Sequence, residues 1–181
     1  MDKRRTLSVL VENRPGVLSL VARFFSRNGF NIESFSAGTT VDHGVTRLTI
    51  EVTADDSHTD LMVAQLNKMV PVHSVKLLDN DHTIRRELVL FKVRATTSDV
   101  RNEIIQIANI FRGSVIDVSR ETLTLSIIGD EKKTEAVREI LEGFGIIELA
   151  RTGMIALERG KYTIDEETKE KGEFNYGKTL L

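Results

Sequence analysis

Along the first eighty residues, apolar positions recur with two different spacings. In some segments they are two residues apart, and in others they are three to four residues apart. The shorter spacing predicts strands with one buried face, and the longer one predicts helices. The expected strands are residues 7–11, 31–37, 48–52 and 75–77. One helix is expected over residues 17–25, between Pro15 and Gly29. A second helix, capped by Asp56 or Ser57, is expected to end before Pro71, so the order of elements is βαββαβ.

The same order recurs in the second half of the chain. The expected strands are residues 89–95, 114–119, 122–128 and 146–150, with residues 154–157 extending the last one. One helix is expected after Ser98 or Asp99 and ends at Gly113, and another is expected between Asp130 and Gly145. The pattern therefore predicts an α+β protein with two ferredoxin-like βαββαβ units.

A short polar segment, residues 79–83, separates the two patterns. We expect a first domain over residues 1–79, a linker over 80–84, a second domain over 85–160 and a C-terminal tail over 161–181. In each unit both helices would cover one face of a four-stranded antiparallel sheet, which leaves the other face and two edge strands open. Edge pairing or face packing would resolve this, so we expect an oligomer.

Composition narrows the function mainly by exclusion. The net charge is −2 and the basic residues are spread along the chain, which argues against nucleic acid or a membrane as the partner. The chain lacks cysteine, and its four histidines all precede residue 83, so a metal site is not expected. No phosphate-binding motif, signal-like segment or catalytic set is evident. A cytoplasmic protein without catalytic residues of its own is the expectation.

The stretch "VENRPGVLSLVARFFSRNGFNIESF", residues 11–35, carries polar residues at both ends of its helix. A Pro-Gly corner leads into a helix N-terminus, whose free N–H groups favour an anion such as an amino-acid carboxylate. The amides of Asn13 and Asn31 could orient the charged groups of such a ligand. Both asparagines could instead serve only their turns, and the pattern alone favours that interpretation.

Several segments together resemble one family. The segments are "LSVLVENRPGVLSLVARFFSRNGFNIESFSAGTT", "VTRLTIEV", "QLNKMVPVHSVKLL", "RELVLFKVRA", "IFRGSVIDVS" and "ELARTGMIALERG". They are similar to the small, regulatory subunits of acetohydroxyacid synthase (acetolactate synthase) over about residues 4–160. The resemblance implies an N-terminal ACT domain, an ACT-like second domain, and a homodimer in which two ACT sheets pair side by side.

The resemblance also implies an effector site for valine, or another branched-chain amino acid, at the ACT dimer interface. By position, one protomer would contribute Asn13, Gly16, Val17 and Leu18, and the partner would contribute Asn31 and Ile32. The N–H groups of Val17 and Leu18 at the helix start would receive the carboxylate of the amino acid. The amides of Asn13 and Asn31 would orient its charged groups.

The function implied is activation of a catalytic large subunit together with valine feedback inhibition in branched-chain amino acid biosynthesis. Thiamine diphosphate, Mg²⁺ and FAD would belong to that partner, and this chain would bind none of them. A free-standing ACT-type amino-acid sensor that regulates another enzyme is the alternative. A metal-responsive regulator is rejected because the second unit lacks His and Cys ligands.

Overall fold

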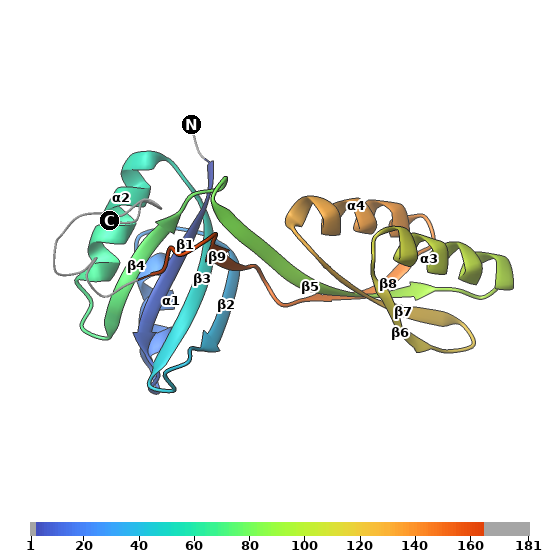
Figure 1. Cartoon of the computed structure of the whole chain (residues 1–181), viewed down its shortest axis with the longest axis horizontal. Coiled ribbons are helices and arrows are strands. Elements are labelled where there is room, and N and C mark those ends of the chain that lie inside the picture. Colours follow the sequence, from blue (N-terminus) through green and yellow to red (C-terminus); the bar gives the residue numbers. More distant parts are fainter. Residues whose placement is uncertain (1–2, 165–181) are drawn as a thin grey trace. The chain divides into compact units, whose positions relative to one another are not determined.

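The computed structural model describes residues 3–164, and its chain divides into two compact units. The first unit takes the residues up to Ile84 and those from Met154 onward, and the second is Arg85–Gly153. Each unit contains a β-sheet and two helices (Figure 1). The α+β class and the two ferredoxin-like units predicted from the sequence are therefore confirmed.

The first unit is a four-stranded antiparallel sheet with the strand order β2-β3-β1-β4. Its elements are β1 Lys3–Glu12, α1 Val17–Arg27, β2 Ile32–Thr39, β3 Val45–Ala54, α2 Asp56–Asn67 and β4 Val72–Leu78. Alternate residues of β1 and β3 join the inward faces of both helices in one core, as a period of two requires. Strands β2 and β4 form the edges of this sheet.

The second unit repeats the arrangement with the strand order β6-β7-β5-β8. Its elements are β5 Thr83–Arg94, α3 Ser98–Ile110, β6 Ser114–Val118, β7 Thr122–Gly129, α4 Glu131–Glu142 and β8 Ile146–Arg151. The strand β9, Ile155–Glu158, pairs with β5, in which the chain passes from the first unit into the second. A separate core fills the space between the sheet and its helices.

Two helix caps lie one residue earlier than predicted. Asp55, rather than Asp56 or Ser57, caps α2 by accepting from the His58 N–H at 2.8 Å. Thr97, rather than Ser98 or Asp99, caps α3 by accepting from the Val100 N–H. In both places neighbouring residues can act as the acceptor, so the sequence does not select between them. Asp130 caps α4 as predicted.

The chain crosses between the units twice, between Ile84 and Arg85 and between Gly153 and Met154. Strand β5 starts at Thr83, inside the segment expected as a linker. Residues 154–157, expected to extend the last strand of the second unit, begin a segment that the structure groups with the first unit. Strand β9 nevertheless pairs with β5, the strand with which β8 also pairs, so residues 154–157 extend the last strand in the second sheet as predicted.

Residues 154–164, here called the strap, return to the first unit and pass across its strands (Figure 1). The Met154 N–H donates to Ser34 Oγ of β2 at 2.8 Å, and Arg47 of β3 donates to the Ala156 carbonyl at 3.1 Å. Lys76 of β4 pairs with Glu158 at 2.6 Å, with each side chain only 3% exposed. The strap thus covers part of the sheet face opposite the helices, which we expected an oligomer to cover.

The turn after α3 requires glycine at a defined position. Arg112 adopts a left-handed conformation with φ of 52°, and Gly113 donates from its N–H to the Ala108 carbonyl at 2.7 Å. A Cβ at Gly113 would lie 2.2 Å from Ile127 Cδ1 and 3.0 Å from the Ser126 carbonyl oxygen. This closeness lets α3 end directly against β7.

Gly113→Ala should therefore lower the free energy of unfolding of the second unit by about 1–3 kcal/mol, because the new methyl overpacks against backbone. Gly143→Ala is the matched control, since a Cβ there meets only the Ile140 carbonyl at 3.7 Å. Urea unfolding of the two variants measures the difference. Equal stability of both variants would contradict the close approach.

The Lys76–Glu158 pair allows a double-mutant cycle. Lys76→Met should cost about 3–5 kcal/mol, because it leaves the buried Glu158 carboxylate without its cation. Lys76→Met with Glu158→Leu should recover most of that loss, since neither charge then remains buried. Urea unfolding of the full chain provides the measurement. A double variant no more stable than Lys76→Met would contradict the proposed burial of the pair.

Candidate functional site

The corner between β1 and α1 is a tight turn whose geometry follows from its two central residues. Pro15 fixes one φ angle, and Gly16 takes a φ of 87° and a ψ of −17°, which together match a type II turn. The Val17 N–H closes the turn on the Arg14 carbonyl at 3.4 Å. Gly16 is needed here for its backbone angles, since no atom of the described chain lies within 4 Å of a Cβ built on it.

The N-terminus of α1 has no side-chain cap and no acidic residue in its first turn. Asp55, Thr97 and Asp130 supply side-chain acceptors at the other three described helices. The first-turn N–H groups of α1, including that of Leu18, thus carry the positive end of the helix dipole without a local acceptor. The Val17 N–H, also expected to bind a carboxylate, is partly engaged by Arg14.

Asn13 joins the corner to the hairpin between β2 and β3. Its side-chain nitrogen donates to the His43 carbonyl at 2.8 Å, and its backbone N–H donates to the Gly44 carbonyl at 2.7 Å. In this chain the amide nitrogen of Asn13 therefore serves the turn, which is the alternative to ligand binding that the sequence analysis gave. The amide oxygen is the part of Asn13 that could face an ammonium group.

The second predicted group lies where α1 ends and β2 begins. Asn31 is exposed, and its side-chain nitrogen donates to Glu33 Oε1 at 3.1 Å. Ile32, half-buried, packs against the core of the first unit and is the first residue of the edge strand β2. Helix α1 has 11 residues and so is about 16 Å long. The two groups therefore lie at opposite ends of one helix and do not meet within one chain.

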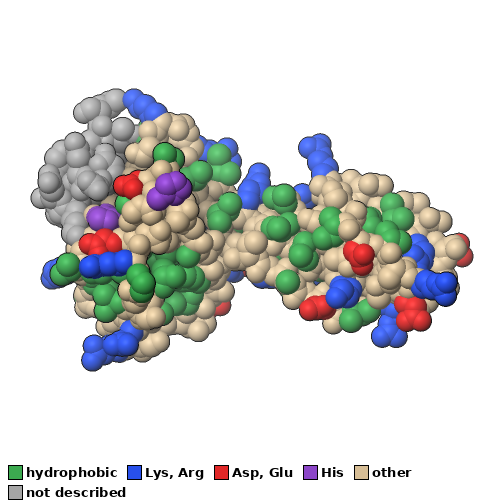
Figure 2. Space-filling model, turned by 90° about the horizontal axis from the view of Figure 1, so that it is seen from below, with side chains coloured by type: hydrophobic (Ala, Val, Ile, Leu, Met, Phe, Trp, Pro, Cys, Tyr) green, Lys and Arg blue, Asp and Glu red, His purple; other side chains and the backbone are tan. Residues whose placement is uncertain are grey.

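The sequence analysis did not identify Leu20 as an exposed apolar side chain of α1. It is 41% exposed on α1, and Leu18 is 43% exposed two residues earlier. Figure 2 shows a face of the first unit on which hydrophobic side chains gather beside charged ones. The helical spacing alone could have indicated Leu20, because it falls outside the inward set of Val17, Val21 and Phe25.

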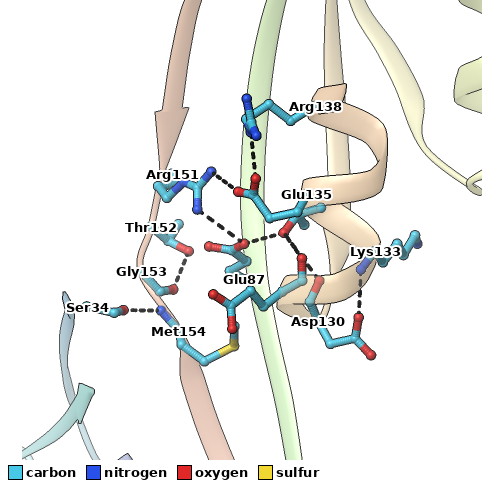
Figure 3. Close-up of polar contacts among 12 residues, drawn as sticks. Ser34, Glu87, Asp130, Lys133, Glu135, Arg138, Arg151, Thr152, Gly153 and Met154 are labelled. Carbon is cyan, nitrogen blue, oxygen red and sulfur yellow. Dashed lines mark hydrogen bonds and ion pairs between the residues drawn. The ribbon is translucent and has the colours of Figure 1, made fainter. Parts of the chain in front are cut away.

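In the second unit, the densest polar cluster ties α4 to β5 and β8 (Figure 3). The Thr134 hydroxyl donates to the buried Glu87 at 2.5 Å. Arg151 reaches Glu87 at 3.8 Å and Glu135 at 3.1 Å, while Arg138 donates to Glu135 at 2.5 Å. The hydrogen bond from Arg138 holds the pKa of Glu135 below its usual value, with a further contribution from Arg151. These contacts describe a structural tie between elements.

Within residues 3–164, no three His, Asp or Glu side chains gather in a way that could hold a metal ion. None of the helices in that range is both long and apolar enough to cross a membrane.

The comparisons with known proteins agree with this organisation. A family described as "AHAS small subunit-like ACT domain" matches residues 7–74, and one described as "Small subunit of acetolactate synthase" matches residues 86–160. An acetolactate synthase small subunit of Mycobacterium bovis is 47% identical over 87% of this chain and 94% of its own length. A probable acetolactate synthase small subunit of Methanothermobacter thermautotrophicus is 46% identical, with the same coverage of both chains.

A solved structure supports the fold over the same range. The crystal structure of the acetolactate synthase small subunit from Thermotoga maritima is 38% identical to this chain, with a TM-score of 0.82. The match covers 88% of this chain and 99% of that one.

Two ferredoxin-like units, the first an ACT domain, define a protein of the ACT-containing class. Within that class, the matches across both units show that the chain belongs to the family of acetolactate synthase small subunits.

The lowered pKa of Glu135 predicts a pH dependence of stability. A carboxylate whose pKa falls on folding stabilises the protein above its unfolded pKa, and this contribution is lost as the pH falls through the folded value. Glu135→Gln should therefore be less stable than the wild type at pH 7, and the gap should close below about pH 4. Because the Glu135 side chain is half-buried and about a third of it remains exposed, solvent screens the ion pair and we expect a modest gap.

Urea unfolding at pH 7 and pH 3 measures this gap. Glu139→Gln, on an exposed position of the same helix, is the control and should show no comparable gap at either pH. A gap for Glu135→Gln that persists unchanged at pH 3 would contradict an ionised, paired Glu135.

Proposed function

We propose that this chain is the regulatory subunit of an acetolactate synthase and that two copies together bind a branched-chain amino acid. The observation that carries the proposal is the separation of the two predicted groups by the length of α1. Asn13, Gly16, Val17 and Leu18 lie at one end of this helix, and Asn31 and Ile32 lie at the other. One pocket can contain both groups only if a second copy contributes one of them.

The edge strand β2 offers a way to bring a second copy into place. Within the described sheet it pairs on one side only, with β3. Its exposed residues Ala37 and Gly38 are small, which permits close approach of another backbone. Antiparallel pairing of β2 with its counterpart would make one sheet of eight strands and a symmetric homodimer.

Each residue of the proposed pocket has a physical role. The N–H of Leu18, with that of Val17 once its weak turn bond opens, would receive the carboxylate at the helix N-terminus. The side-chain oxygens of Asn13 and Asn31 would accept from the ammonium, and Ile32 would contact the aliphatic chain. One methylene changes the binding free energy by about 1–3 kcal/mol, so selectivity for valine over leucine or isoleucine should be modest.

Regulation follows from linkage between this site and the catalytic large subunit. The dimer would activate that subunit, and valine would favour an arrangement that activates it less. Contact with the catalytic subunit must then change the affinity for valine by the same factor. Thiamine diphosphate, Mg²⁺ and FAD would be held by the catalytic partner.

Complementation between protomers tests the pocket. Asn13→Ala and Asn31→Ala should each weaken valine binding in the homodimer by about tenfold, through loss of one hydrogen bond to a charged group. Mixed dimers of the two variants should regain one intact pocket in two, because one pocket then combines the unaltered sides of both chains and the other combines their altered sides. Calorimetry with valine gives the affinity and the number of sites.

Asn102→Ala, at an exposed position of α3 in the second unit, is the matched control and should bind valine normally. Mixed dimers that regain no site would refute a pocket shared between protomers. Addition of the chain to a catalytic subunit, with and without valine, tests the wider role. An unchanged rate in both conditions would favour a sensor that acts on a different enzyme.

A further inference from the structure

A second cavity lies within the first unit, between the strap and the sheet face opposite the helices. It has a volume of about 360 Å³ and is separate from the corner between β1 and α1. Its floor includes Leu10 and Arg47, which are paired neighbours on β1 and β3. Leu157, Glu158 and Tyr162 of the strap form the opposite wall.

The cavity is lined by one cationic and one anionic side chain that each have a buried polar atom without a hydrogen-bond partner in the described structure. In the described structure, Nε of Arg47 is buried and has no hydrogen-bond partner, although the guanidinium also donates to the Ala156 carbonyl. Oε1 of Glu158 is likewise buried without a partner, while Oε2 pairs with Lys76. Because a buried polar atom without a hydrogen-bond partner destabilises the folded state, both atoms would gain from a ligand with complementary groups.

The charges around the cavity balance. Lys76 pairs with Glu158, and Arg47 and Asp42 contribute one further charge of each sign to the lining. Burial lowers the pKa of Arg47, whereas the negative charge of Glu158 raises it. A zwitterion, which carries one positive and one negative charge, therefore fits better than a simple anion or cation. Either of those would leave one charge of the cavity uncompensated.

The remaining lining is partly aliphatic and partly polar, since Thr40, His73 and Tyr162 also contribute to it. Leu10, Val45 and Leu157 contribute apolar side chains to the lining. Such side chains favour a short aliphatic chain over a sugar or a phosphate group. The volume accommodates a ligand of amino-acid size.

We propose that this cavity binds a small aliphatic zwitterion, an α-amino acid with free ammonium and carboxylate groups, between Arg47 and the acidic side chains Asp42 and Glu158. The site is formed within a single protomer, and it does not require the corner pocket. Because the strap forms one wall, the ligand stabilises the strap on the sheet.

The test uses L-valine as the probe on the full chain, with Asn13→Ala and Asn31→Ala combined to disable the corner pocket. Calorimetry should still find one site per chain. Arg47→Met on this background should weaken binding by about tenfold or more, because the carboxylate loses its guanidinium. Val45→Phe, which fills the cavity without changing its charge, should weaken binding similarly.

Arg120→Met, which removes an exposed guanidinium from the second unit, is the control and should bind like the background chain. Thermal unfolding verifies that each variant is folded. N-acetyl-L-valine, which lacks the ammonium, and isobutylamine, which lacks the carboxylate, should each bind about tenfold more weakly than valine. Equal binding of either analogue would overturn the zwitterion assignment.

The outcomes separate this site from the corner pocket. Loss of all valine binding in Asn31→Ala alone, which leaves the contacts of Asn13 with the turn intact, would overturn the cavity site while supporting the corner pocket. Binding that survives both Arg47→Met and Val45→Phe would overturn it as well. Binding that responds to Arg47→Met but not to the asparagine changes would support the cavity and refute the corner pocket.

Discussion

The organisation of the first unit depends on one constraint: a four-stranded sheet whose two helices lie on the same face leaves the other face and both edges open. Along the strands, most of the residues that point away from the helices are polar, as expected of a surface in water. Several of them are nevertheless buried, namely Thr6, Ser8, Thr49, Glu51, Ser74 and Lys76. The strap contributes to this burial, and the Lys76–Glu158 ion pair links it to the edge strand β4. The open face is thereby partly covered within the chain, so the open edges are the stronger argument for the proposed homodimer.

The spacing of apolar residues, together with the glycines that end helices, was sufficient to predict the order of elements in both units. The alternation in β1 and β3 and the glycines after α1, α3 and α4 are local signals, and they predicted the two βαββαβ patterns. The caps were wrong by one residue because adjacent side chains can make the same bond. The contacts that residues 154–158 make with the first unit could not be predicted. The contact of Met154 with Ser34 joins residues 120 positions apart, and no local pattern encodes such a pair.

The candidate sites also combine features that local sequence predicts with features that depend on distant contacts. The Pro-Gly corner is encoded locally, and its turn geometry follows from Pro15 and Gly16 alone. Whether Asn31 from another copy completes a pocket depends on assembly, which a single sequence expresses only through family resemblance. Arg47 and Glu158 carry no motif at all. They become neighbours of one cavity only because the strap returns across the sheet.

The turn between β2 and β3 connects the two proposed sites. Asn13 donates to the carbonyls of His43 and Gly44, and the Gly44 N–H donates to Asp42 Oδ1 at 2.8 Å. Asp42 lines the cavity, so one short hydrogen-bonded path leads from the corner to the far side of the sheet. A ligand that reorients Asn13 must change the position of this turn or lose those bonds. If both sites bind, occupancy of one therefore changes the affinity of the other, and linkage requires the effect to be equal in both directions. Coupling of this kind would let the strap respond to an effector that it does not touch.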